Sequence, residues 1–193
     1  MGRTRATLGV VVAAVALTVG VTDCGGGQAG HRRGVGAFAW LRPAPPPTGW
    51  KVARIPGGST LAYPPGWKPI KTDPGTATVA LLGGGKRIDG YLNATPKQGS
   101  ETPANWRSFR VDHNRGEGSR NVRLAASADD LRFRSGRGSC VVDSYTTSKA
   151  AYREIACLVA GPSSSAVVVA AAPVELWHDQ AATLQRAVSS FVP

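Results

Sequence analysis

Hydrophobic and polar positions alternate in two neighbouring runs between residues 139 and 161, which a short polar stretch separates. This pattern predicts two antiparallel strands joined by a turn at Ser148 and Lys149. The pairing that suits this turn places Cys140 directly opposite Cys157. Opposed Cα atoms in such a pair lie about 4.5–5.5 Å apart, which overlaps the range of a disulfide. We therefore expect a Cys140–Cys157 disulfide in a central hairpin.

The same pairing sets Asp143 opposite Glu154, and like charges that face each other destabilise a sheet. A basic strand beside the hairpin would relieve this repulsion, and residues 131–134 (Leu-Arg-Phe-Arg) alternate in that way. We expect this strand to pair with Phe133 opposite Cys140, which puts Arg132 on the face of the acid pair. Serine-lysine is a poor two-residue turn, so a one-residue slip stays open. Two buried free thiols are the alternative to the disulfide.

Further apolar and alternating runs predict more strands and two helices. A closing helix begins near Val174, because apolar side chains from Trp177 to Phe191 recur at helical spacing and mark a core-facing stripe. Thr102 and Pro103 start the other helix, which ends near Gly116. The remaining strands are expected at 50–55, 59–63, 76–82, 88–95, 122–126 and 166–172. This order predicts an α+β domain over 49–193, with a mostly antiparallel meander sheet covered by two helices.

The amino end has the layout of an export signal. Arg3 and Arg5 precede an uncharged apolar run from residue 6 to 22, and the sequence Val-Thr-Asp-Cys follows at 21–24. This resembles a bacterial lipoprotein signal peptide, in which the cysteine is lipidated and becomes the mature amino terminus. The resemblance implies a signal peptide over 1–23 and lipid on Cys24. Asp23 departs from the pattern, which wants Gly, Ala or Ser there.

Two alternatives stay open for this segment. The apolar run could remain as an uncleaved anchor helix, or cleavage elsewhere could leave Cys24 free. The count of three cysteines divides naturally into one anchor and one disulfide. Residues 24–48 are rich in Gly and Pro and are expected to form a tether. The protein is then extracytoplasmic and anchored to the cell membrane, or secreted if Cys24 carries no lipid.

Charge gives the chain a basic character. The formal net charge is +11, and residues 24–139 hold eighteen Lys and Arg against seven Asp and Glu. Arg123, Arg132 and Arg134 form the candidate anion-binding face, with the alternative that they only neutralise the acid pair. Because of the export signal, lipid head groups or anionic envelope polymers are the expected partners, and nucleic acid is not. The sequence names no partner protein.

The sequence contains no recognisable catalytic motif. The three histidines are His31, His113 and His178, and neither H-E-x-x-H, C-x-x-C nor G-x-S-x-G occurs. We therefore expect no metal, no cofactor and no catalytic residue. A pocket that brings His113 or His178 to a serine and a carboxylate would favour the alternative function, an envelope hydrolase.

Residues 50–193 resemble the PsbP-like family, which includes the extrinsic subunit of photosystem II and actinobacterial lipoproteins of the LpqN type. The resemblance is carried by the Tyr-Pro-Pro-Gly-Trp turn at 63–67, the single mid-chain helix, the strand meander, and a closing helix that ends in Ser-Ser-Phe at 189–191. It implies an α/β/α sandwich and a role in binding or assembly, usually without catalysis. We therefore expect an exported, lipid-anchored binding or interaction module of the cell envelope.

Overall fold

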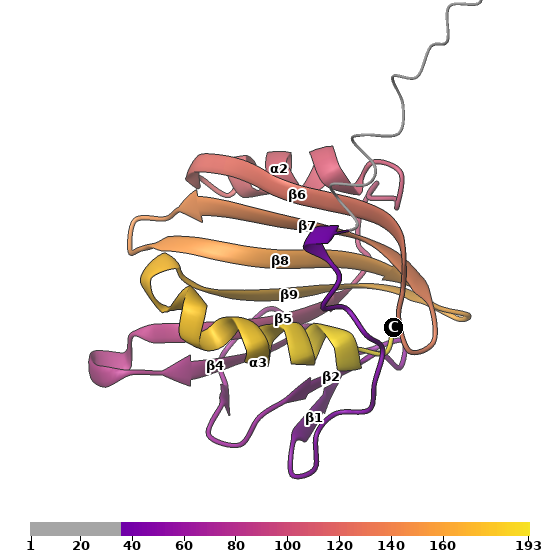
Figure 1. Ribbon diagram of the computed structural model, residues 1–193, viewed down its shortest axis with the longest axis horizontal. Helices are drawn as coiled ribbons and strands as arrows, with labels where there is room; N and C mark the ends of the chain where they lie inside the picture. Colours follow the sequence, from indigo (N-terminus) through magenta and orange to yellow (C-terminus); the bar gives the residue numbers. More distant parts are fainter. Residues whose placement is uncertain (1–35) are drawn as a thin grey trace, which may run out of the picture.

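Seven antiparallel strands form the main sheet of the computed structural model, which describes residues 36–193 (Figure 1). The spatial order is β3-β4-β5-β9-β8-β7-β6, and β1 and β2 form a separate two-stranded sheet. Cys24 and the signal run lie outside the described residues. The strands are β1 (Lys51–Arg54), β2 (Thr60–Tyr63), β3 (Lys68–Pro69), β4 (Ala77–Leu82), β5 (Ile88–Pro96), β6 (Arg120–Arg132), β7 (Arg137–Thr146), β8 (Ala151–Ala160) and β9 (Ser165–Pro173).

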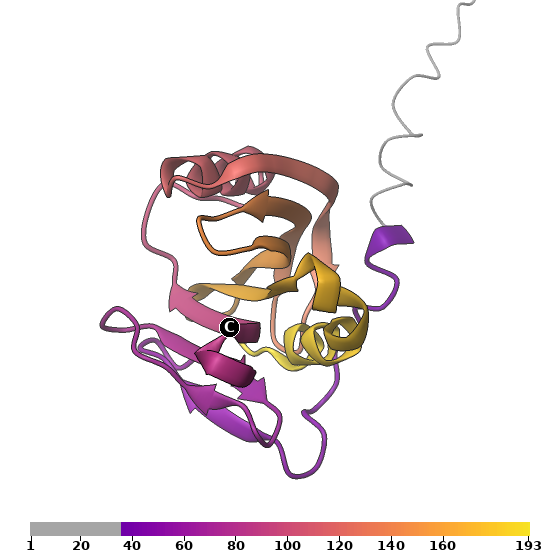
Figure 2. The ribbon, with the colours of Figure 1, turned by 90° about the vertical axis from the view of Figure 1, so that its left-hand side faces the viewer.

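Two α-helices cover the two faces of this sheet (Figure 2). α2 (Trp106–Gly116) lies on one face, and α3 (Trp177–Ser190) lies on the other after a short 3-10 turn, η2 (Val174–Leu176). A second 3-10 turn, η1 (Gly84–Lys86), joins β4 and β5. The expected α+β class and two-helix cover are confirmed. Within the described residues no helix is long and apolar enough to cross a membrane.

The core is divided by the sheet because successive side chains of a strand point to opposite faces. On β8, Ile155, Cys157 and Val159 belong to the cluster on the α3 side. Ala156 and Leu158 belong to the smaller cluster that packs under α2. Between β5 and β8, strand β9 is covered on both faces, which explains why its sequence is apolar throughout.

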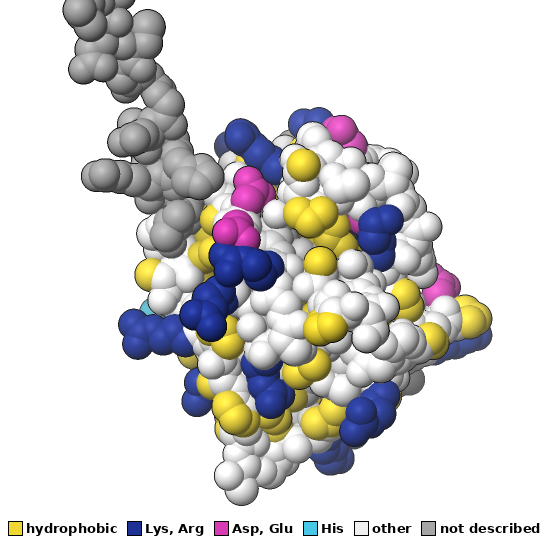
Figure 3. All heavy atoms as spheres, turned by 90° about the vertical axis from the view of Figure 1, so that its right-hand side faces the viewer, with side chains coloured by type: hydrophobic (Ala, Val, Ile, Leu, Met, Phe, Trp, Pro, Cys, Tyr) yellow, Lys and Arg dark blue, Asp and Glu magenta, His cyan; other side chains and the backbone are white. Residues whose placement is uncertain are grey.

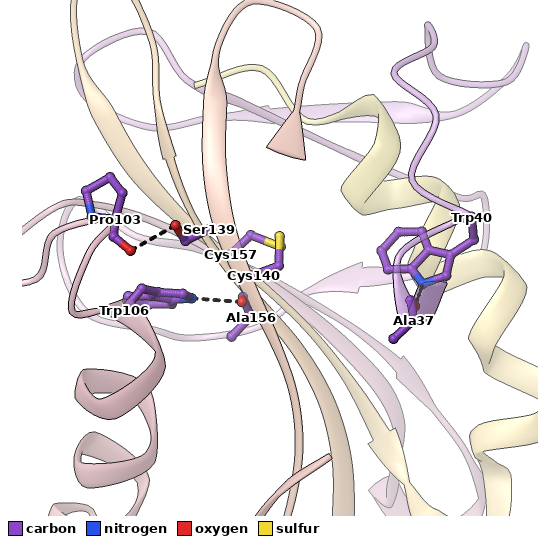
Figure 4. The surroundings of a disulfide bond; sticks show 8 residues. All are labelled: Ala37, Trp40, Pro103, Trp106, Ser139, Cys140, Ala156 and Cys157. Carbon is purple, nitrogen blue, oxygen red and sulfur yellow. Dashed lines mark hydrogen bonds between the residues drawn. A yellow bond between two sulfur atoms is a disulfide. The ribbon is translucent and has the colours of Figure 1, made fainter. Parts of the chain in front are cut away.

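The central hairpin has the expected register. Cys140 pairs with Cys157 and Asp143 pairs with Glu154, and the two cysteines form a disulfide that is almost fully buried on the α3 side (Figure 4). The side chain of Thr147 explains why a serine-lysine turn holds this register. Its Oγ1 accepts the backbone N–H groups of Lys149 and Ala150, each at 3.1 Å, so the turn does not need Asn-Gly.

The expected pairing of residues 131–134 is wrong. They do not form a strand of their own, because β6 runs without a break from Arg120 to Arg132. Arg132 lies opposite Arg137, four residues from the expected partner Val141, and the Phe133 N–H donates to the Gly136 carbonyl to close a tight turn. Three irregularities in the β6–β7 register shift the alignment along the strand.

Residues 36–50 also differ from the expectation of a tether that reaches residue 48. Phe38 is buried in the core on the α3 side, and Trp40 and Leu41 pack against it. The Ala44 N–H donates to the Ser189 carbonyl at 3.2 Å, which fixes the segment along α3. Residues 36–48 of the expected tether are therefore packed as part of the folded domain.

The first helix begins later than expected. Thr102 and Pro103 form a turn, and α2 starts at Trp106. The Thr102 N–H donates to Asn105 Oδ1 at 2.6 Å, and Thr102 Oγ1 accepts the Asn105 N–H at 3.2 Å. These reciprocal bonds fix the turn ahead of the helix, so the N-cap is Asn105, three residues after the expected Thr102.

Removing the disulfide should destabilise the domain. It closes a loop with a sequence separation of 17, and a crosslink of that size contributes about 3 kcal/mol to the free energy of unfolding. We expect Cys140→Ala/Cys157→Ala to lose about that amount in urea unfolding. Reductant should lower the unfolding midpoint of the wild type and leave the double variant unchanged. Recovery of both cysteines as alkylated free thiols from exported protein would contradict the pairing.

Candidate functional site

Helix α2 buries a face that is mainly polar. Its buried residues are Trp106, Arg110 and Asn114, which recur every fourth position and therefore lie on one side of the helix. Trp106 Nε1 donates to the Ala156 carbonyl at 3.0 Å and anchors the first turn on β8 (Figure 4). The other two residues reach the acid pair of the central hairpin. The helix is thus held by polar bonds as well as by apolar contact.

Asp143 and Glu154 face each other directly in the sheet, and both are completely buried. Arg110 Nε donates to Glu154 Oε1 at 2.6 Å, which compensates one of the two carboxylates. Asp143 receives a hydrogen bond only from Asn114 Nδ2, at 3.2 Å, and its Oδ1 has no partner among the described residues. The two acids therefore have different surroundings although they are paired across the strands.

Burial raises the pKa of Asp143 to about 7, and the negative charge of Glu154 adds to this shift. The nearby charge of Arg110 and the bond from Asn114 act in the opposite direction but do not outweigh burial. An isolated buried carboxylate is costly in its charged form, so this site favours the protonated acid.

Two tyrosines complete the shell around Glu154. Tyr145 Oη donates to Glu154 Oε2 at 3.1 Å, and Tyr91 Oη does so at 3.4 Å. The two hydroxyl oxygens also lie 2.7 Å apart. Burial, followed by the charge of Glu154, raises the pKa of both tyrosines well above the usual range, so both stay protonated and act as donors.

The acid pair is thus neutralised from the helix, and the expected role of the β6 arginines in it is wrong. Arg132 lies opposite Arg137, six residues from Asp143, which is about 20 Å along an extended strand. Arg123 pairs with Ser144, seven β7 residues from Arg137, so it lies about 23 Å along the sheet from Arg132. The three candidate anion-binding arginines Arg123, Arg132 and Arg134 are exposed, but the structure does not bring all three together. Their binding of an anion stays a prediction.

A cleft of about 240 Å³ opens beside α2, at the edge where the chain passes from β5 into the helix. Glu101 lies at its wall and is only 4% exposed. Its carboxylate accepts the backbone N–H groups of Gln98 and Gly99, each at 2.8 Å. Burial opposes the charged form, but these backbone bonds outweigh it and lower the pKa of Glu101. The lining residues are Thr95, Pro96, Gln98, Gly99, Glu101, Trp106, Phe109, Arg110, His113 and Val167.

Arg110 connects this cleft with the acid pair. Its Nε is occupied by Glu154, whereas no hydrogen bond to its two Nη atoms occurs within the described residues. Neither Nη atom is fully buried without a partner, and Arg110 lines the cleft. The Nη edge of its guanidinium is therefore accessible from the cleft. A guanidinium edge with free donors suits a carboxylate or phosphate oxygen.

Aromatic rings form the apolar wall of the cleft. Trp106 and Phe109 stack with ring centroids 6.0 Å apart, and Phe109 and His113 follow at 6.3 Å. Burial lowers the pKa of His113, and the charge of Arg110 acts in the same direction, so the imidazole is neutral near pH 7. The cleft therefore combines a fixed cation, a neutral ring stack and one carboxylate.

The other sequence-predicted residues fall elsewhere. Cys140 and Cys157 form the disulfide on the opposite face of the sheet, and Cys24 lies outside the described residues. Sequence reasoning missed Arg110, Asn114 and Glu101. For Arg110 and Asn114 the signal was their spacing from Trp106, which places two polar residues on the same helix face as a tryptophan.

No protein-family model and no curated protein matches this sequence. Among solved structures, the chain is similar to the cyanobacterial PsbP protein CyanoP from Synechocystis sp. PCC 6803. The identity is 12% and the TM-score is 0.57, with 76% of this chain and 93% of that chain covered. A protein of unknown function from Pseudomonas aeruginosa, PA94, is similar with a TM-score of 0.50 and 12% identity, covering 75% and 96%.

The chain therefore has a PsbP-like fold, as the sequence resemblance implied. At 12% identity this likeness establishes the fold alone. LpqN of Mycobacterium tuberculosis, described as involved in cell envelope biogenesis, matches at 12% identity over 75% of this chain and 91% of its own. Its TM-score of 0.39 is too low to bear on the function of this chain.

The buried acid pair predicts a pH dependence of stability. The pKa of Asp143 is raised from 3.8 to about 7, so the folded state holds this proton more tightly than the unfolded chain. Protonated Asp143 makes its full contribution to the free energy of unfolding below about pH 4, and this contribution falls as the pH rises to about 7. Asp143→Asn, which resembles the neutral acid, should remove this loss and be more stable than the wild type above pH 7, by on the order of 4 kcal/mol.

Urea unfolding at several pH values measures this difference. The exposed Asp129→Asn is the matched control, and its difference from the wild type should stay constant with pH. If the free energies of unfolding of Asp143→Asn and the wild type differed by the same amount at low and high pH, the raised pKa of Asp143 would be contradicted.

Proposed function

We propose that this protein is an exported, lipid-anchored binding module of the cell envelope. The observation that carries the proposal is the Cys140–Cys157 disulfide, which is buried in the larger core cluster. Structural disulfides persist in oxidising compartments outside the cytoplasm and are rare within it. The basic amino end, the apolar run and Cys24 supply the matching export and anchoring signals.

The cleft beside α2 is the binding site that the geometry supports best. Its open guanidinium edge on Arg110 suits an anionic group, and the stacked rings of Trp106, Phe109 and His113 suit a flat apolar part. Glu101 adds a hydrogen-bond acceptor in the same space. We infer that the ligand is a small organic acid that also carries a hydrogen-bond donor. The cleft volume of about 240 Å³ favours a ligand smaller than a typical drug.

An envelope hydrolase is the second function that the sequence left open. His113 lies in the cleft with Glu101, but no serine or cysteine lines that cleft within the described residues. Nor does any hydrogen bond join His113 to a hydroxyl group there, and His178 is exposed at the start of α3. A nucleophile and a base within hydrogen-bond reach are the core of such a site. Binding is therefore the better-supported function.

The anchor is tested by metabolic labelling with a fatty-acid probe. We expect the wild-type protein to be labelled and Cys24→Ser to be unlabelled, because the cysteine of the signal resemblance is the acylated residue. Asp23→Gly should raise the processed fraction if the departure at that position slows processing. Equal labelling of the wild type and Cys24→Ser would show that Cys24 is not the anchor.

The cleft is tested with 4-hydroxybenzoate, a small aromatic acid whose hydroxyl is free to donate. Arg110→Lys keeps a positive charge beside Glu154 but removes the two free Nη groups, so the fold should survive. Loss of charge-assisted hydrogen bonds should weaken 4-hydroxybenzoate binding at least about tenfold in calorimetry. Arg107→Lys, on the exposed side of α2, is the control and should bind as the wild type does. If Arg110→Lys bound the ligand as tightly as the wild type does, Arg110 would not be the group that binds an anion in this cleft.

A further inference from the structure

The described N-terminal segment separates two hollows on the α3 side of the domain. One, of about 460 Å³, is lined by Trp40, Arg42 and Trp50 together with α3 residues that include Arg186. The other, of about 480 Å³, lies between residues 43–45 and residues 132–134. Arg42 and Pro43 are neighbours in sequence, so the two hollows adjoin along this segment.

Four arginines and two tryptophans mark this region, which we name the tether-side surface. All four arginines are exposed, and none of them forms an ion pair within residues 36–193. No acidic residue of the described chain lines either hollow. In Figure 3, Lys and Arg side chains lie beside the N-terminal segment together with acidic side chains, and further Lys and Arg side chains are spread over the rest of this face. The tether-side surface consists of Trp40, Arg42, Trp50, Arg132, Arg134 and Arg186.

The two tryptophans have one side in the protein and one side at the surface. Both are partly buried and pack against the larger core cluster. Trp40 Nε1 donates to the Ala37 carbonyl at 2.9 Å, which holds its ring in place. Tryptophan is enriched at membrane interfaces because its apolar body and polar edge suit the head-group region.

The position of this surface follows from where the described chain begins. Twelve peptide units join Cys24 to Gly36, so a lipid on Cys24 lies at most about 43 Å from the domain. A domain of residues 36–193 has a radius of gyration of about 15 Å. The linker limit exceeds this radius, so the tether alone does not orient the domain. The surface beside Gly36 is the part closest along the chain to the attachment point at Cys24.

We propose that the tether-side surface docks on an anionic membrane. This inference rests on the proposed lipid anchor and adds the orientation of the domain on the membrane. The arginines supply attraction to anionic head groups, which is worth about fivefold in partitioning for each basic residue close to the surface. The two tryptophans favour a lipid surface over a soluble polymer, because an indole gains from the interface and not from a dissolved chain.

Docking in this way places the α2 cleft on the side away from the bilayer. α3 and the N-terminal segment lie on one face of the sheet, and α2 lies on the other (Figure 2). A ligand could then reach Arg110 from the space beyond the membrane while the domain stays docked. The sheet separates the membrane contact from the binding site.

The test uses the mature chain from position 24 onward with Cys24→Ser, so that docking is measured without the lipid. Labelling of Cys24 is a separate experiment, so failure of the anchor and failure of docking are distinguishable. The chain is sedimented with vesicles of phosphatidylcholine alone and of equal parts phosphatidylcholine and phosphatidylglycerol. We expect binding to the anionic vesicles only, and this binding should weaken with salt.

Two double variants and one matched control locate the surface. Arg42→Gln/Arg186→Gln and Arg132→Gln/Arg134→Gln should each lower partitioning about 25-fold, from about fivefold for each arginine. Lys68→Gln/Lys71→Gln removes the same charge from β3, the opposite edge strand of the sheet, and the loop just after it. The loss of partitioning should stay within about twofold because distant charges are screened. Equal losses from all three would overturn the proposal and leave only a generally basic protein.

The tryptophans distinguish a membrane from an anionic polymer. Emission should shift to the blue on anionic vesicles, and Trp40→Phe/Trp50→Phe, which keeps apolar rings in place, should lose most of this shift. Soluble polyphosphate should compete only weakly for the protein. Tight polyphosphate binding that depends on the same arginines, without any emission shift on vesicles, would overturn docking on lipid in favour of a wall polymer.

Discussion

The contact between Arg110 and Glu154 determines how one whole side of the protein is built. Two carboxylates face each other at the centre of a sheet, fully removed from water, and this arrangement is unfavourable without a cation. The cation comes from α2, so the helix must lie with Arg110 and Asn114 over the hairpin. The same placement puts Arg110 between the core and the cleft, because its Nε bonds Glu154 while the residue also lines the cleft.

The sequence predicted the strands around this contact better than the contact itself. Placing Cys140 opposite Cys157 predicts the full register of β7 and β8, including the unfavourable pairing of Asp143 with Glu154. The need for a compensating cation was therefore visible. It was assigned to Arg132 and Arg134 because alternating arginines near a hairpin suggest a neighbouring strand. A helix that carries its cation on a buried face runs against the usual rule that polar residues mark the solvent side.

The register of β6 could not be predicted from alternation alone. Asn121 and Asp130 adopt positive φ values of 55° and 57°, and the pairing shifts next to both of them. Each shift moves the later residues relative to β7, so an alignment counted back from the turn accumulates error. Asparagine and aspartate tolerate this conformation better than other residues, which is the only local sign of it in the sequence.

Residues 36–50 show that amino-acid composition alone does not predict whether a segment is packed or forms a spacer. Their prolines and glycines suggest a spacer, and the structure instead packs Phe38 into the core beside α3. The aromatic residues interspersed with the prolines were the signal, because a solvated spacer gains nothing from burying rings. Residues 36–50 place Trp40 and Arg42 beside α3, at the end where the described chain begins, which is why the arginines of that side carry the argument for docking.

An acid bound in the proposed site would share its cation with Glu154, and this links the cleft to the core. Arg110 Nε bonds Glu154 in the core, and an acid bound in the cleft would interact with the Nη edge of the same guanidinium. If Asp143 also ionised, three negative groups would depend on one guanidinium. Burial prevents this by keeping Asp143 protonated up to about pH 7. The neutral aspartic acid thereby leaves the charge of Arg110 available to a ligand, so the unpartnered Oδ1 in the core and the open Nη edge in the cleft are parts of the same electrostatic balance.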